Sequence, residues 1–132
     1  MTQQSSMPNL SARLKERNQQ ALAAMQTAAA HSELCMARIQ RFGPTALLRL
    51  VEVANGDSGQ SHHCRRILLA IYNGSRWPLD PTRLRALDGD LKQAAFITLE
   101  WATFSRRELH EYLDDGEKLM RRFRLIETGG RE

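Results

Sequence analysis

The chain has 132 residues, of which 42% are hydrophobic and 26% charged, and its formal net charge is +4. This length and composition are typical of one globular domain with an optional arm, and they exclude collagen-like and low-complexity classes. No apolar run approaches the roughly 18 residues of a membrane-spanning helix, and MTQQSSMPNL lacks the features of a secretory signal. We therefore expect no membrane partner. Because two cysteines form no disulfide framework, we expect a reduced, cytoplasmic protein.

The positive charge is concentrated in residues 1–78, whereas residues 79–132 carry nearly equal numbers of basic and acidic side chains. Arg outnumbers Lys sixteen to three. A guanidinium offers a planar set of donors that matches phosphate or carboxylate, so the bias favours an anionic partner. The same bias also follows from GC-rich coding DNA, and both explanations stay open.

Residues 1–42 are expected to form an N-terminal helical arm, with residues 1–8 disordered. Asn9 or Ser11 is suited to cap its first helix. The helix propensity is high, because Ala, Gln, Arg, Lys and Glu dominate, but the apolar stripe is thin. Such a helix is typical of an exposed or partner-binding element, including one that joins two copies of the chain.

Two breaks are expected in this arm. His31-Ser32 is expected to interrupt the helix, with Ser32 capping a continuation through Cys35, Met36, Ile39 and Phe42. Gly43-Pro44 is expected to end it, because Gly suits a helix C-terminus and Pro cannot continue the hydrogen bonding.

Residues 43–127 are expected to form a compact helical bundle. Two amphipathic stripes lie on either side of the turn GDSGQ and are expected to face each other. The first stripe contains Ala46, Leu47, Leu50, Val51 and Ala54, and the second contains Cys64, Ile67, Leu68, Ile71 and Tyr72. Ser58 or Ser61 is expected to cap the second helix.

Later helices follow from their start signals. Asp80-Pro81 predicts a short helix, because an N-cap Asp precedes Pro at the first helical position. Trp77 is expected to anchor the preceding loop on the core. Asp90 is expected to cap a strongly buried helix, whose stripe contains Leu91, Ala94, Ala95, Thr98, Leu99 and Ala102, widened by Phe96, Ile97, Trp101 and Phe104.

The last part of the bundle begins at Ser105, which with Glu108 matches a capping box. Asp114-Asp115 is expected to precede the final helix, whose stripe contains Leu119, Met120, Phe123 and Ile126. Residues 128–132 are expected to be a frayed tail. The sequence therefore predicts an all-α fold, a compact bundle of about five to six helices with an N-terminal helical arm.

Three stretches carry a resemblance to a known family: ALLRLVEVANGDSGQSHHCRRILLAIYN, LDPTRLRALDGDLKQAAFITLEW and EYLDDGEKLMRRF. Over about residues 43–125 the chain resembles an uncharacterised small helical domain family, a domain of unknown function. That family occurs in proteobacterial genomes, plasmids and integrated mobile elements. The resemblance implies a helical fold and a mobile-element context, and it transfers no chemistry to particular residues.

The sequence offers little catalytic chemistry. Gly56-Asp57-Ser58-Gly59 matches the tetrapeptide around the nucleophile of trypsin-like proteases, but that chemistry needs a β scaffold with a distant His and Asp. A tight turn accounts for the same residues. We see no paired carboxylates and no phosphate loop, so we expect a non-enzymatic protein without a cofactor.

A zinc site is a weaker alternative. His31 and Cys35 lie one helical turn apart, and His63 and Cys64 could complete a tetrahedral set. The usual short Cys-x-x-Cys pair is missing. Packing of Cys64 in the core, with histidines at the surface, explains the same pattern.

Basic side chains off the apolar stripes form a candidate surface for a partner or for nucleic acid. The candidate residues are His62, His63, Arg65, Arg66, Arg76, Arg106 and Arg107. Arg106 and Arg107 have acidic neighbours, whereas Arg65-Arg66 has only Asp57 nearby in sequence, which makes it the centre of the expected face. Residues 44–72 could form a helix-turn-helix, but the five-residue turn GDSGQ, which contains two glycines, is loose for that motif.

These observations favour a non-enzymatic binding module of a mobile element that acts on a protein or nucleoprotein partner. An anti-defence inhibitor, of the anti-CRISPR kind, is the specific version that the mobile-element context suggests. Direct binding of DNA or RNA through the face around Arg65-Arg66 is the alternative, and an enzyme or zinc protein is third.

Overall fold

The computed structural model describes residues 10–130, and every regular element within them is a helix. This confirms the predicted all-α class with five to six helices. The elements are α1 Leu10–Ala54, α2 Gly59–Tyr72, α3 Pro81–Arg85, α4 Gly89–Phe104, the 3-10 helix η1 Leu109–Tyr112 and α5 Gly116–Thr128. Residues 1–8, expected to be disordered, lie outside the described residues, as do 131–132.

The chain divides into two compact units, Met1–Ala37 and Arg38–Glu132. In residues 10–37, five large apolar side chains are exposed: Leu10, Leu14, Leu22, Met25 and Leu34. The hydrophobic core runs from Ile39 to Phe123 and so belongs to the second unit. An arm that folds separately from a bundle over residues 43–127 stays a prediction.

Helix α1 continues through both expected breaks, so the predicted interruption at His31-Ser32 and end at Gly43-Pro44 were wrong. Gly43 is buried because α4 packs against it: a Cβ atom there would lie 2.9 Å from Trp101 Cδ2. Pro44 is exposed, so the carbonyl that loses its hydrogen bond lies on the solvent side. Close packing, and not helix termination, explains the glycine.

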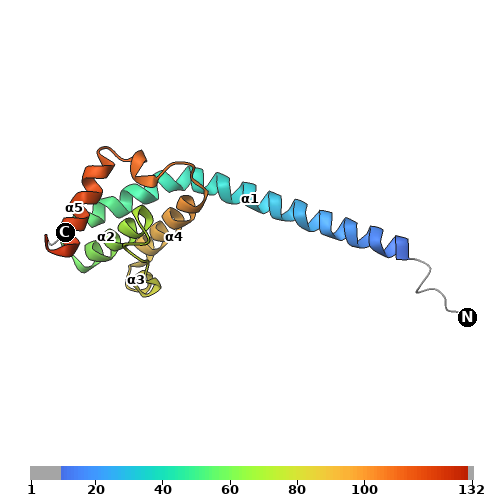
Figure 1. Ribbon diagram of the computed structural model, residues 1–132, viewed down its shortest axis with the longest axis horizontal. Helices are drawn as coiled ribbons and strands as arrows, with labels where there is room; N and C mark the ends of the chain where they lie inside the picture. The colour runs from blue at the N-terminus through green and yellow to red at the C-terminus, as the bar shows by residue number, and fades with distance from the viewer. Residues whose placement is uncertain (1–9, 131–132) are drawn as a thin grey trace, which may run out of the picture. The chain divides into compact units, whose positions relative to one another are not determined.

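The core forms where α2, α4 and α5 gather around residues 38–54 of α1 (Figure 1). Both predicted stripes that flank the turn are confirmed: Leu47, Leu50 and Ala54 of α1 and Cys64, Ile67 and Leu68 of α2 are buried. Ser58 caps α2, with its hydroxyl accepting from Ser61 N at 3.1 Å. The turn GDSGQ thus ends one core helix and starts the next.

Helix α4 buries one face and exposes the other. Leu91, Ala94, Ala95 and Thr98 of the predicted stripe are buried, together with Trp101. Phe96 and Phe104 are exposed instead of widening the core. The N-cap is Asp88 and not Asp90, so the helix starts two residues earlier than expected.

The inward face of α5 continues at Glu127 instead of Ile126. Met120 and Phe123 are buried as predicted, whereas Ile126 is 48% exposed. The Glu127 side chain, one residue further on, is only 2% exposed. Hydropathy alone assigns Ile126 to the core, but the α-helical period after Met120 and Phe123 points Glu127 inward.

Of the predicted helix caps and loop anchor in the second half of the chain, some are confirmed and others lie elsewhere. Asp80 caps α3 through Thr82 N, and Trp77 is buried, as expected. The capping box predicted at Ser105 lies instead at Glu108, which pairs with Glu111 and starts only the short η1. Helix α5 runs through Thr128, one residue beyond the expected end of the bundle.

Candidate functional site

One buried carboxylate gathers the basic side chains of α2. Glu127 on α5 accepts from Arg65 Nε at 2.8 Å through Oε2 and from Arg66 Nε at 2.6 Å through Oε1. His62 Nδ1 lies 2.6 Å from the same Oε1. The spacing i, i+3, i+4 on α2 places all three side chains toward α5. We call these four residues the Glu127 cluster.

Arg65 is an interior residue. Its side chain is 8% exposed, and its Nη1 donates to the carbonyl oxygens of Ala54 and Gly56, each at 2.9 Å. Of the Arg65-Arg66 pair expected at the centre of a basic face, Arg65 therefore lies inside the fold and only Arg66 is partly exposed. The Glu127 carboxylate, 62 residues away in sequence, and the carbonyls at the end of α1 satisfy the Arg65 guanidinium. A partner-binding role for the other candidate residues stays a prediction.

Arg66 is held from two sides but remains partly exposed. Its guanidinium lies 4.7 Å from the ring centroid of Trp77, a cation–π geometry, while its Nε donates to Glu127. The side chain is 32% exposed. Trp77 therefore both anchors its loop and fixes the direction of a surface cation.

Arg83 on α3 joins both histidines. Its Nη1 lies 3.2 Å from His62 Nε2 and 3.4 Å from His63 Nδ1. An imidazole nitrogen accepts from a guanidinium N–H through its lone pair, so His62 Nε2 and His63 Nδ1 are placed as acceptors for the same Arg83 Nη1.

Burial and charge oppose each other at this cluster. Burial alone would raise the pKa of Glu127, but the hydrogen bonds from Arg65 and Arg66 outweigh it, and the pKa lies below its usual value. Burial lowers the pKa of His63, and the neighbouring His62 and Arg83 lower it further. The cluster is therefore arranged for an ionised Glu127 and a neutral His63.

The remaining candidate residues lie on other segments. Arg76 is exposed on the loop after α2, where its backbone N–H donates to Asn73 Oδ1. Arg106 and Arg107 are exposed between α4 and η1, and Arg107 stacks on Tyr112 at 4.5 Å. The predicted surface is thus divided, with His62, His63, Arg65 and Arg66 brought together on α2.

The residues of the zinc alternative are placed as follows. Cys35 Sγ lies 3.5 Å from His31 Nε2, one turn apart on α1. Cys64 is fully buried, and burial raises the pKa of its thiol to about 11, which disfavours the thiolate that binds metal. Within residues 10–130, no three His, Cys, Asp or Glu side chains gather in a metal-binding arrangement.

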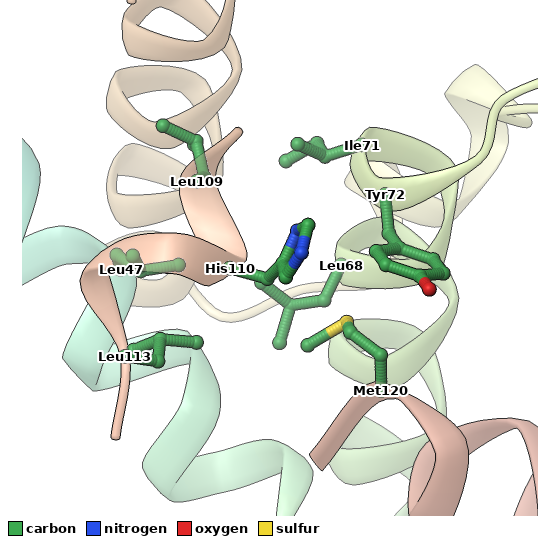
Figure 2. Close-up of a pocket in the computed structure, with 8 residues that line it drawn as sticks. All are labelled: Leu47, Leu68, Ile71, Tyr72, Leu109, His110, Leu113 and Met120. Carbon is green, nitrogen blue, oxygen red and sulfur yellow. The ribbon is translucent and has the colours of Figure 1, made fainter. Parts of the chain in front are cut away.

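A small apolar cavity of about 10 Å³ lies between α2, η1 and α5 (Figure 2). The His110 imidazole points into it beside Leu68, Ile71 and Tyr72. On the solvent side, Glu117 accepts from Tyr72 Oη at 2.8 Å and lies 2.9 Å from His110 Nε2. This size matches at most one water molecule, so the cavity fits no organic substrate.

The outer face of α4 forms an open groove of about 460 Å³. Phe96 and Phe104 are 52% and 44% exposed and line it together with Ile97 and Leu99. Polar groups border it, since Arg38 and Glu100 approach to 3.8 Å. An apolar strip with exposed aromatic rings is the kind of surface that partners bury.

Sequence reasoning missed three contributors: Glu127, Arg83 and the α4 groove. The signal for Glu127 was its spacing after Met120 and Phe123, which places it on the buried face. Arg83 joins the cluster through the fold, because α3 contacts α2. Phe96 and Phe104 were assigned to the core because their hydropathy was taken as burial.

Comparisons with known proteins place the bundle in a family. A model described as a family of unknown function (DUF7673) matches residues 44–125. Neither a curated protein nor a solved structure matches the chain. No helix in the described part of the chain has the length and apolarity needed to cross a membrane. Because the family model covers more than half of its residues, the chain belongs to the DUF7673 family of unknown function.

Proposed function

We propose that the protein is a non-enzymatic binding module whose outer α4 face docks on a protein partner. The observation that carries this proposal is the groove lined by the half-exposed rings of Phe96 and Phe104. Burying both rings would give the central apolar anchor that protein interfaces use. The bordering Arg38 and Glu100 would supply the polar rim.

This proposal moves the main contact away from the centre expected from sequence. Arg65 is committed to Glu127 inside the fold, so it has no exposed donor face to offer. The exposed apolar side chains of residues 10–37 support a second contact, with the partner or with another copy of the chain. A mobile-element context and an inhibitor of a host defence complex belong to the same proposal and rest on the resemblance, whereas a cytoplasmic location rests on the cysteine usage.

The test compares capture of partners from the native host by three proteins. They are the wild-type chain, Phe96→Asp/Phe104→Asp, and the control Leu48→Asp, which charges a somewhat more exposed apolar residue outside the groove. We expect the double variant to lose a partner that the wild type and control retain. Retention of every partner by the double variant, with its far-ultraviolet spectrum unchanged, would exclude the α4 face.

Direct nucleic-acid binding is the second proposal, favoured by the sequence pI of about 9.6 and by the exposed Arg106 and Arg107. Phosphate contacts release counterions, so binding of duplex DNA or of RNA should weaken steeply between 50 and 200 mM salt, by roughly 10³-fold for a six-contact site. Arg106→Gln/Arg107→Gln should weaken it and reduce the salt slope. Absence of binding at low salt leaves the protein-partner proposal alone.

A further inference from the structure

In the described part of the chain, the guanidinium of Arg83 is held by ring nitrogens and not by a carboxylate. Across residues 10–130, no acidic side chain forms an ion pair with it, and its Nη1 instead contacts the imidazoles of His62 and His63. Asp80, the N-cap of α3, accepts from the backbone and hydroxyl of Thr82 and interacts with Arg83 through its charge without forming an ion pair. The guanidinium of Arg83 therefore keeps donors that no described carboxylate occupies.

The charges around His62 do not balance. The guanidinium groups of Arg65, Arg66 and Arg83 contribute three positive charges, and Glu127 contributes one negative charge. Apart from the imidazoles, three minus one leaves two positive charges among the side chains in direct contact, and Asp80 acts on Arg83 only through its charge. A dianion would neutralise this excess.

Donors for such an anion lie on both sides of His62. Arg66 uses its Nε for Glu127, and among the described residues its Nη groups donate no hydrogen bond. Arg83 uses one Nη for the imidazoles. His62 contacts Glu127, the carboxylate that holds Arg66, through Nδ1 and contacts Arg83 through Nε2, so Glu127 and His62 together link the two guanidinium groups.

The cluster also supplies the rigidity that an anion site requires. Arg66 is fixed by Trp77 and Glu127, and Arg83 is fixed by two ring nitrogens. Fixed guanidinium groups lose little side-chain entropy when they bind, and their planar donor sets match phosphate oxygens.

We propose that Arg66 and Arg83 form a binding site for a phosphate monoester dianion, with Glu127 holding Arg66 in place. The excess of two positive charges matches a dianion better than the single charge of a phosphodiester. This site lies on α2 and α3 and is independent of the α4 groove. It would let the protein respond to a phosphorylated small molecule or to inorganic phosphate.

The experiment measures binding of inorganic phosphate and of glycerol phosphate to the full chain. Chloride at matched ionic strength is the reference, and the signals are arginine Nε–H resonances and melting temperature. We expect a saturable shift of the Arg66 and Arg83 resonances and a rise in melting temperature. Arg83→Gln should weaken binding by at least tenfold. Arg85→Gln, which removes the same charge from the same helix, should leave binding unchanged.

The possible outcomes decide the proposal. A phosphate effect no larger than that of chloride, or full binding by Arg83→Gln, overturns it. Displacement of phosphate by a short DNA duplex at lower concentration than glycerol phosphate requires would show a diester site and also overturn it. Since Arg83 lies on a short surface helix, a wild-type far-ultraviolet spectrum of the variant separates loss of binding from loss of folding.

Discussion

Glu127 is a buried charge whose removal leaves other buried charges without compensation. In Glu127→Gln, Arg65 would keep its guanidinium in the core, and breaking a buried pair in this way costs about 3–5 kcal/mol. We expect urea unfolding to show a loss of this size. Glu52→Gln removes an exposed carboxylate from an ion pair with Arg49 and should change stability far less. Equal losses in the two variants would show that burial of Glu127 is unimportant.

The depressed pKa of His63 makes stability depend on pH. The folded chain favours the neutral imidazole. The contribution of His63 to the free energy of unfolding is therefore present above the unfolded pKa of about 6.5 and is lost as pH falls through the folded pKa. We expect the free energy of unfolding to decrease from pH 7.5 to pH 5. His63→Gln should flatten part of that decrease, and parallel curves for the two proteins would contradict the prediction.

The contribution of Glu127 to the free energy of unfolding is lost in a lower pH range than that of His63. Its folded pKa lies below the ordinary value of 4.5, so its contribution is present above 4.5 and disappears as pH falls through the folded pKa. Acid unfolding of the wild type should therefore be steeper than that of Glu127→Gln. The slopes of stability against pH below pH 4.5, measured by urea unfolding, test this expectation, and identical slopes would count against it.

Among the elements, the contact between α1 and α4 depends on a missing side chain. A Cβ atom at residue 43 would lie 2.9 Å from two atoms of the Trp101 ring. In Gly43→Ala, overpacking should cost about 1–3 kcal/mol, offset in part by about 1 kcal/mol of helix propensity. We expect a lower melting temperature.

Gly59→Ala is the matched control, because nothing lies within 4 Å of an added Cβ there and only helix propensity acts. Its melting temperature should stay constant or rise slightly. If Gly43→Ala also leaves the melting temperature unchanged, the α1–α4 contact is looser than the structure describes.

The elements also show what local sequence can predict. Helix α2 was largely predictable, because its apolar stripe is clear and Ser58, one of two expected caps, starts it. The length of α1 was not, because the local signal of Gly43-Pro44 opposes packing against α4, which is distant in sequence. The same dependence on contacts distant in sequence applies to the candidate site. Local sequence predicts Arg65 at the surface, and only the fold brings Glu127, 62 positions later, beside it.

For the whole molecule, the division between Ala37 and Arg38 leads to a test of independence. From Leu10 onward, the first residue of the hydrophobic core is Ile39, so deleting residues 1–30 should remove helical signal but leave the melting temperature nearly unchanged. Circular dichroism and thermal melting measure both quantities. Unfolding of the truncated chain would show that the first residues of α1 are part of the core.

The same truncation tests self-association. Large apolar side chains exposed on residues 10–37 gain little in water unless another surface covers them. If two copies of the chain pair through this segment, the full chain should show a concentration-dependent mass in sedimentation that the truncated chain lacks. If the full chain is monomeric, self-association through residues 10–37 is excluded, and contact with a protein partner remains as the proposed role of these side chains.

The two tryptophans lie in different surroundings, and this gives the protein two internal optical reporters. Trp77 lies under the Arg66 guanidinium near α2, whereas Trp101 lies against Gly43 and 4.8 Å from the ring of Tyr112. Each emission can be isolated by changing the other tryptophan to Phe. Coincident unfolding transitions from the two would indicate that α2 and α4 unfold in one cooperative step. If only the Trp77 emission changes when a ligand is added, the ligand is on the α2 side of the molecule.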